Sequence, residues 1–174
     1  MTDTLTPVLT DNWDQDRSWT IAAYEERGGY RSLDAAFAMA PDDLVTMVKD
    51  SGLRGRGGAG FPAGIKWNTV MLAEADQKYV VCNADEGDSG TFADRMLMEG
   101  DPFTLIEGMA IAGIAVGAGQ GYVYIRSEYP DAIRAMREQG RTVIEPTAEG
   151  EEAWVRHHDE TASANLISKT NSWY

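Results

Sequence analysis

Residues 78–90, KYVVCNADEGDSG, begin as a short apolar run and pass directly into an acidic segment. The β-branched residues of the run are typical of a buried strand, and the acidic residues mark its end. Open α/β sheets bind ligands outside the carboxyl ends of their strands. The acidic segment is therefore a candidate binding loop that follows a strand.

The residues downstream predict further alternation of helix and strand. Residues 101–119, DPFTLIEGMAIAGIAVGAG, suit a helix of small residues that packs closely against a sheet. Residues 121–126, GYVYIR, predict a second strand, and residues 129–140 predict a helix between Pro130 and Gly140. Because strands that alternate with helices form parallel sheets, the expected fold class is α/β.

Upstream, residues 17–50 are predicted to be helical. Pro41 suits the first turn of the last helix in this region, and Gly52 suits its end. The glycine-rich segment that comes next therefore follows a helix.

Charge and composition exclude several classes of function. The chain of 174 residues has a formal net charge of -13 at pH 7, which argues against nucleic-acid binding because phosphates require clustered cations. The longest apolar stretch falls short of the roughly 20 residues that span a bilayer. The polar N-terminus lacks the features of a secretory signal, so we expect a cytoplasmic protein without direct membrane insertion.

The single cysteine, Cys82, excludes an internal disulfide and a four-thiolate zinc or iron–sulfur site within the chain. In an apolar strand it is interpreted as a small buried residue rather than a nucleophile. His157 and His158 are adjacent and are interpreted as a solvated pair, so no metal site is expected.

Residues 51–67, SGLRGRGGAGFPAGIKW, form a glycine loop with the pattern G-x-G-x-x-G at Gly55, Gly57 and Gly60. The dinucleotide fingerprint requires a strand before the loop and a helix opening within it. Here a helix precedes the loop and Phe61-Pro62 follows it. The pattern alone therefore leaves a simple glycine-rich connector as an alternative.

Three features of the glycine loop favour a bound phosphate beside an aromatic ring. Four glycines within six residues cost conformational entropy, which is better understood if a ligand approaches the backbone. Arg54, Arg56 and Lys66 supply cations on both sides of the loop. Phe61 offers a ring on which a flat heterocycle can stack.

The acidic segment from Asn83 to Gly90, NADEGDSG, is no EF-hand, because Met96 occupies the position of the bidentate glutamate. Its carboxylates repel phosphate and better suit sugar hydroxyls or a ring edge, and Asn83 supplies a donor and an acceptor. A solvated acidic turn is the alternative.

The two motifs together carry a family resemblance. LRGRGGAGFPAGIKW, KYVVCNADEGDSGTFADRMLMEGDPFTLIEGMAIAG and GYVYIRSEYPDAI occur in this order. They resemble the NADH-oxidising flavoprotein subunit of bacterial respiratory complex I. The same module occurs as the diaphorase (beta) subunit of NAD-dependent formate dehydrogenases and of NAD-linked hydrogenases, which are alternatives. The resemblance covers residues 7–137.

The resemblance implies FMN and NAD(H) as cofactors, with a hydride passing from NADH to FMN and electrons leaving through iron–sulfur clusters. It implies no catalytic side chain, because the cofactor carries the reaction. The implied cofactor-binding residues are Gly55, Arg56, Gly57, Gly58 and Lys66 for the flavin and its phosphate, Asn83, Asp85 and Glu86 for the flavin or ribityl chain, and Ala59, Gly60, Phe61, Glu86 and Asp88 beside NADH. Many complex I members have Glu at the position of Asp88, so the side chain here is one methylene shorter.

The resemblance also implies architecture and partners. A helical segment, 1–50, would precede a partly parallel βαβα, Rossmann-like FMN/NADH-binding half-domain, 51–140, that is incomplete. Expected partners are peripheral-arm subunits of complex I, especially the 2Fe–2S thioredoxin-like subunit, which would hold the chain at the inner membrane. The resemblance implies a 4Fe–4S cluster in the full-length family. The cysteine ligands of that cluster are absent from this chain.

Residues 141–174 form a foreign-looking tail. EEAW and KTNSWY in this tail resemble the C-terminal region of Baeyer–Villiger monooxygenases. The expected join lies between Arg137 and Arg141. The chain is therefore expected to be a truncated or fused fragment that is weakly active or inactive alone, and a non-catalytic fragment is the alternative from another class.

Overall fold

The computed structural model describes residues 7–56, 58–88, 90–139, 142–146 and 153–157. Its helices are α1 (Ile21–Glu26), α2 (Arg31–Phe37), α3 (Pro41–Asp50), α4 (Ala63–Leu72), α5 (Ala93–Gly100), α6 (Pro102–Val116) and α7 (Pro130–Gln139). Its strands are β1 (Tyr79–Ala84), β2 (Gln120–Ile125), β3 (Thr142–Pro146) and β4 (Ala153–His157). Within these ranges, no helix is long and apolar enough to cross a membrane.

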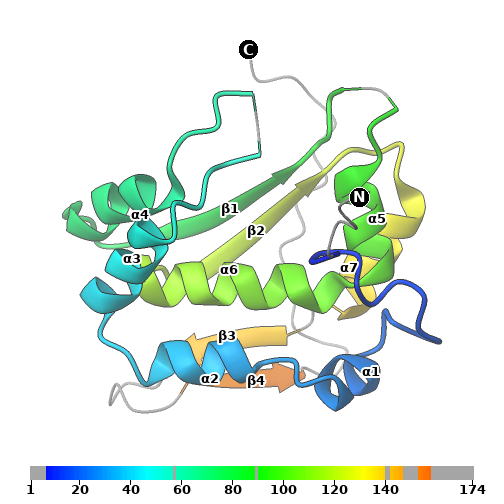
Figure 1. Ribbon diagram of the computed structural model, residues 1–174, viewed down its shortest axis with the longest axis horizontal. Helices are drawn as coiled ribbons and strands as arrows, with labels where there is room; N and C mark the ends of the chain where they lie inside the picture. The colour runs from blue at the N-terminus through cyan, green and yellow to red at the C-terminus, as the bar shows by residue number, and fades with distance from the viewer. Residues whose placement is uncertain (1–6, 57, 89, 140–141, 147–152, 158–174) are drawn as a thin grey trace, which may run out of the picture.

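Strands β1 and β2 are parallel, with Val81 opposite Tyr122 and Ala84 opposite Ile125. The chain between them forms α5 and α6, and α7 follows β2 (Figure 1). Parallel neighbours require such a crossover, because the chain must return to the same end of the sheet. The predicted α/β class with a parallel sheet is confirmed, and β3 and β4 form a separate antiparallel pair.

Helix α6 packs against both strands and also contacts α2 (Figure 1). Pro102 occupies its first turn, and Gly117 ends it with a left-handed φ of 72°. A small residue of α6 faces the sheet, because a methyl group added at Gly113 would lie 4.0 Å from Cγ2 of Val80 on β1. The prediction of a small-residue helix packed on a sheet is confirmed.

Two clusters of buried apolar side chains form the core. One joins the carboxyl ends of β1 and β2 to α5 and α7, and consists of Ala84, Met98, Ile125, Tyr129, Ala132 and Met136. The other joins α2, α3 and the end of α6, and consists of Ala36, Leu44, Val45, Ala115 and Val116. The core therefore anchors the helices beside both candidate loops.

The predicted N-terminal helical region is confirmed as three separate helices, α1, α2 and α3. Pro41 begins α3, and Gly52 lies just beyond its C-cap with a φ of 70°. The domain boundaries at residues 50 and 140 stay predictions.

Two helices, α4 and α5, were not predicted. Helix α4 begins at Ala63, directly after Phe61-Pro62. Pro62 is the N-cap of α4 and suits this position, because the first residues of a helix have no intrahelical acceptor for an N–H group. The strand that a dinucleotide fingerprint requires before the loop is not found, since α3 precedes it.

Candidate functional site

The glycine loop doubles back on itself between α3 and α4. Arg54 and Pro62 form an antiparallel bridge, and the N–H of Gly55 donates to the carbonyl of Phe61 at 2.8 Å. The N–H of Ala63 donates to the carbonyl of Leu53 at 2.8 Å. The base of the loop is therefore closed by backbone hydrogen bonds, while Arg56, Gly58 and Ala59 are exposed. Gly57 lies outside the described residues.

The cations of the glycine loop have different roles. Nε of Arg54 donates to the carbonyl of Gly60 at 2.6 Å, and Nη1 of Arg56 donates to the carbonyl of Arg54 at 3.1 Å. Lys66 is exposed on α4, and no hydrogen bond or ion pair to its side chain is found among the described residues. The Arg54 side chain thus stabilises the conformation of the loop, whereas the ammonium group of Lys66 is available to bind a ligand.

Helix α4 adds a positive dipole end to this region. Its first turn follows Pro62 and contains no acidic residue. Helix N-termini favour anions, because their first N–H groups lack intrahelical acceptors and the macrodipole is positive there. The glycine loop, Lys66 and the start of α4 together suit a phosphate group.

The acidic loop after β1 is an ordered turn. Oδ1 of Asn83 accepts from the N–H of Asp85 at 3.1 Å, and the Asp88 carbonyl accepts from Oγ1 of Thr91 at 2.9 Å. Asp88 is exposed and Asp85 is half-buried. The polar side chains of this loop therefore lie at the carboxyl end of a parallel strand, where α/β folds bind ligands.

Glu86 has a structural role that was not predicted. Its carboxylate accepts from the N–H groups of Asp94 and Arg95 at 3.1 and 3.3 Å. It thereby caps the start of α5 from eight residues upstream. A short-range capping pattern could not reveal this contact, because the intervening loop must fold back first.

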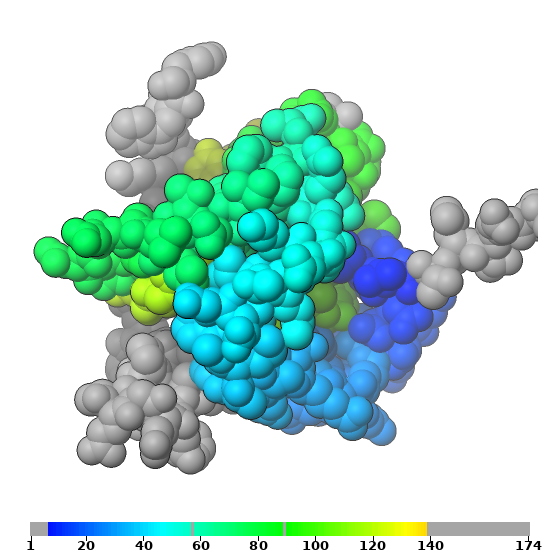
Figure 2. Space-filling view, turned by 60° about the vertical axis from the view of Figure 1, so that its left-hand side comes forward, coloured from blue at the N-terminus to red at the C-terminus, as the bar shows by residue number. Residues whose placement is uncertain are grey.

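The glycine loop and the acidic loop lie on the same side of the molecule in both views (Figures 1 and 2). The glycine loop is next to α3 and α4, and the acidic loop lies beyond the end of β1. Among the described residues, no hydrogen bond or ion pair joins the two loops. Phe61 of the glycine loop is 54% exposed.

A family profile matches residues 48–160, which include both loops, and is described as the Nuo51 FMN-binding domain. The chain belongs to this family. The predicted family resemblance is confirmed, and the match extends past the expected join at residues 137–141. The monooxygenase-like tail and the join stay predictions.

Curated relatives of this Nuo51-family chain include an NADH-quinone oxidoreductase subunit of Rhizobium meliloti, 53% identical over 133 residues. That match covers 76% of this chain and 32% of the relative. The HndC subunit of the NADP-reducing hydrogenase of Solidesulfovibrio fructosivorans is 56% identical over 118 residues, covering 68% and 24%. The chain therefore spans about a third or less of these relatives.

A solved structure of similar fold is the NAD+-reducing [NiFe]-hydrogenase in the air-oxidized state. Its TM-score is 0.57 and its sequence identity is 36%, over 70% of this chain and 22% of that chain. The H2-reduced state has a TM-score of 0.55 at 40% identity, covering 59% and 18%.

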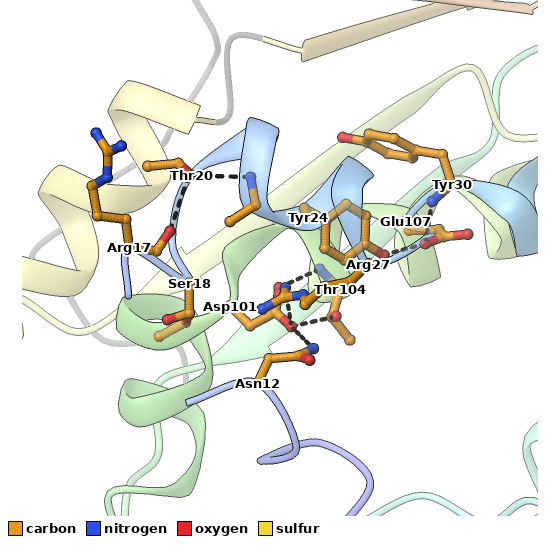
Figure 3. A network of polar contacts seen from close by, with 12 residues as sticks. Asn12, Arg17, Ser18, Thr20, Tyr24, Arg27, Tyr30, Asp101, Thr104 and Glu107 are labelled. Atoms are coloured by element: carbon orange, nitrogen blue, oxygen red, sulfur yellow. Dashed lines mark hydrogen bonds and ion pairs between the residues drawn. The ribbon is translucent and has the colours of Figure 1, made fainter. Parts of the chain in front are cut away.

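This member of the Nuo51 family also contains a buried polar network that was not predicted (Figure 3). Oε2 of Glu107 accepts from the hydroxyl of Tyr24 and from the N–H of Tyr30, the latter at 3.1 Å, and Oε1 accepts from the N–H of Leu33 at 2.8 Å. Burial, followed by the hydrogen bond to Glu107, raises the pKa of Tyr24. Burial, followed by the Glu107 charge, raises the pKa of Tyr30 to about 12. A carboxylate inside an otherwise apolar helix was the sequence signal for this network.

Asp101 continues the network at the start of α6. Oδ2 of this almost fully buried residue accepts from Nδ2 of Asn12 and from Oγ1 of Thr104, both at 2.9 Å. Nη2 of Arg27 lies 3.5 Å from the same oxygen. These contacts tie the N-terminal segment to α6, so the network supports the fold rather than either candidate loop.

Cys82 is half-buried on β1 and packs against the core cluster at the strand ends. Burial, followed by the Asp94 charge, raises the pKa of its thiol to about 11. The thiol is therefore neutral at pH 7 and a poor nucleophile, which agrees with its interpretation as a packing residue. The side chains of His157 and His158 lie outside the described residues.

We expect the free energy of unfolding to fall between pH 9 and about pH 11 because of Cys82. The unfolded thiol ionises near its ordinary pKa of 9.0, whereas the folded thiol stays protonated until about 11. The folded chain then binds more protons, so this contribution is complete below pH 9 and is lost as pH rises. Urea unfolding of Cys82→Ala should show a smaller decrease over this interval. An identical decrease in both proteins would contradict the assignment.

Proposed function

We propose that the chain binds FMN and NADH and forms part of the flavoprotein subunit of an NADH:quinone oxidoreductase. The observation that carries the proposal is the pairing of the glycine loop with Lys66 and the start of α4, inside the segment that matches the FMN-binding family. Relatives named as subunits of NADH-quinone oxidoreductase support the same function.

The residues present fit a flavin phosphate. A methyl group added at Gly58 would meet no atom within 4 Å, so this glycine is not required by packing within the described chain. Gly60 has a φ of 53°, which favours glycine for conformational reasons. Gly58 therefore supplies open backbone, and Lys66 supplies an exposed cation on the helix that follows the loop, as binding of a phosphate requires.

Within this proposal, Gly55, Arg56, Gly57, Gly58 and Lys66 hold the phosphate side of FMN. Asn83 and Asp85 offer hydrogen bonds to the flavin or the ribityl chain, and Glu86 retains lone pairs beyond those used to cap α5. Ala59, Gly60 and Phe61 face the nicotinamide nucleotide, with Asp88 near NADH. The chemistry that FMN supplies when bound is acceptance of a hydride from NADH and onward transfer of single electrons.

The electron acceptor is proposed to lie in another subunit or segment. The only cysteine is Cys82, and no group of three or more His, Cys, Asp or Glu side chains suited to a metal occurs among the described residues. A cluster-containing partner such as the 2Fe–2S thioredoxin-like subunit would receive the electrons, and would hold the chain at the periphery of a membrane complex.

A diaphorase subunit of a hydrogenase or formate dehydrogenase is the second candidate. The match to a subunit of an NADP-reducing hydrogenase, at 56% identity, favours it specifically. Affinity purification from the native host distinguishes the two, because hydrogenase or formate dehydrogenase subunits would co-purify only in the second case.

Titration of FMN into the purified chain, followed by quenching of flavin fluorescence, tests the proposal. We expect saturable binding that Lys66→Ala weakens about tenfold, since a charge-assisted contact to phosphate is lost. Gly58→Val should leave the chain folded, because a methyl group at this position meets no atom within 4 Å. It should abolish FMN binding, because the valine side chain fills the space in which the phosphate would approach the backbone. Arg134→Ala removes an exposed cation from α7 and serves as the control. Absence of saturable binding in a folded chain would contradict the proposal.

A further inference from the structure

Arg126 connects the carboxyl ends of the two parallel strands. It follows Ile125, the last residue of β2, which lies opposite Ala84, the last residue of β1. Nη1 of Arg126 donates to the carbonyl of Glu86 at 2.8 Å. A side chain from one strand end therefore holds the backbone of the acidic loop that leaves the other.

The guanidinium group of Arg126 is itself held in place. Its central carbon lies 5.4 Å from the centroid of the Tyr129 ring, which belongs to the core. Nε lies 3.4 Å from a carboxylate oxygen of Glu128. Arg95 of α5 approaches the same tyrosine ring at 5.6 Å. A planar guanidinium fixed by an aromatic ring and a carboxylate can direct its remaining donors at one carbonyl.

Glu86 has a backbone conformation that needs external support. Its φ of 47° lies in the left-handed region, which residues other than glycine adopt uncommonly. Its carbonyl is held by Arg126, and its carboxylate accepts from the N–H groups of Asp94 and Arg95. The contacts of its carbonyl and of its carboxylate together maintain this backbone conformation.

We infer that Arg126 is a positioning residue for the cofactor site, acting through the Glu86 carbonyl. By fixing the Glu86 peptide, it sets the direction in which the chain presents Asp85 and Glu86. This inference rests on the proposed FMN function. The β1–β2 ladder is formed by backbone pairing and does not include the Arg126 side chain, so loss of this side chain should disturb the loop more than the sheet.

Two measurements on the full chain test this role. One is the FMN dissociation constant from fluorescence quenching. The other is amide hydrogen exchange at Asp94 and Arg95, compared with exchange at Val81 and Val123 in the β1–β2 ladder. The variants are Arg126→Met, which removes the donors, Arg126→Lys, which restores a single donor, and the control Arg134→Met on α7.

We expect Arg126→Met to weaken FMN binding at least tenfold and to accelerate exchange at Asp94 and Arg95 at least tenfold, with the ladder amides unchanged. Arg126→Lys should recover part of both effects, and Arg134→Met should show neither. The inference would be overturned if Arg126→Met bound FMN as tightly as the wild-type chain and exchanged the amides of Asp94 and Arg95 at the wild-type rate. Exchange that accelerates equally in the ladder would also overturn it, because the role would then be general stability. If the wild-type chain binds no FMN, the proposed function fails. In that case, faster exchange at Asp94 and Arg95 in Arg126→Met would still support the role of Arg126 in positioning the acidic loop. Unchanged exchange at these two amides would overturn that role.

Discussion

Replacement of Glu107 by alanine is expected to lower the free energy of unfolding by about 4 kcal/mol. The carboxylate of this buried residue accepts from three donors, the Tyr24 hydroxyl and the N–H groups of Tyr30 and Leu33. Each buried donor left without an acceptor costs about 1–3 kcal/mol, and water admitted to the new cavity recovers part of this loss. Urea unfolding monitored by circular dichroism measures the difference.

Two further variants identify the cause of the Glu107 effect. Glu107→Gln keeps one acceptor oxygen but turns an amide N–H group toward a donor, so we expect a loss of about 2 kcal/mol. Glu138→Ala on α7 removes an exposed glutamate and should change stability by less than about 0.5 kcal/mol. A Glu107→Ala protein as stable as Glu138→Ala would show that the three donors do not depend on this carboxylate.

Gly64→Ala is expected to destabilise the chain by about 3 kcal/mol, at the upper end of ordinary overpacking costs. A methyl group at Gly64 would lie 2.5 Å from the backbone nitrogen of Lys49 and would also overlap its Cα. Backbone atoms cannot rotate away as a flexible side chain can, so α3 and α4 must separate. Because α4 carries Lys66, we also expect weaker FMN binding in the fluorescence titration.

Gly108→Ala on α6 is the matched control for Gly64→Ala. Both glycines lie inside helices, but a methyl group at Gly108 would meet no atom within 4 Å. Alanine is favoured over glycine in a helix interior, so this variant should gain about 0.5–1 kcal/mol. If both variants were stabilised, the close approach of α3 and α4 would be excluded.

Several elements were predictable because their signals are local. The β-branched run before the acidic residues marked β1, the small residues of 101–119 marked α6, and Pro41 and Pro130 marked helix starts that α3 and α7 confirm. The expectation that the first strand is buried was wrong, because Val81 is 64% exposed and Ala84 is the one buried residue of β1. Periodicity and capping depend on residues only a few positions apart. The family resemblance was likewise recognisable, since its motifs are contiguous and occur in a constant order.

Helix α4 was missed for an equally physical reason. Its sequence, AGIKWNTVML, contains a glycine and β-branched residues that have modest helix propensity. The packing of α4 against α3 explains Gly64, which is required by the backbone of Lys49 rather than by local conformation. Tertiary contacts of this kind override propensity and leave no local pattern.

By itself, the sequence determined the α/β class, the two candidate loops and the family, because each depends on residues that are close together along the chain. The tertiary structure alone decided which groups meet across long separations. It pairs Arg126 with the Glu86 carbonyl across 40 residues and Glu107 with Tyr24 across 83. It also leaves Lys66 exposed, and it uses the Arg54 side chain in a hydrogen bond to the Gly60 carbonyl within the same loop. A hydrogen bond depends on distance and direction in space, and these exist only once the helices and strands have packed.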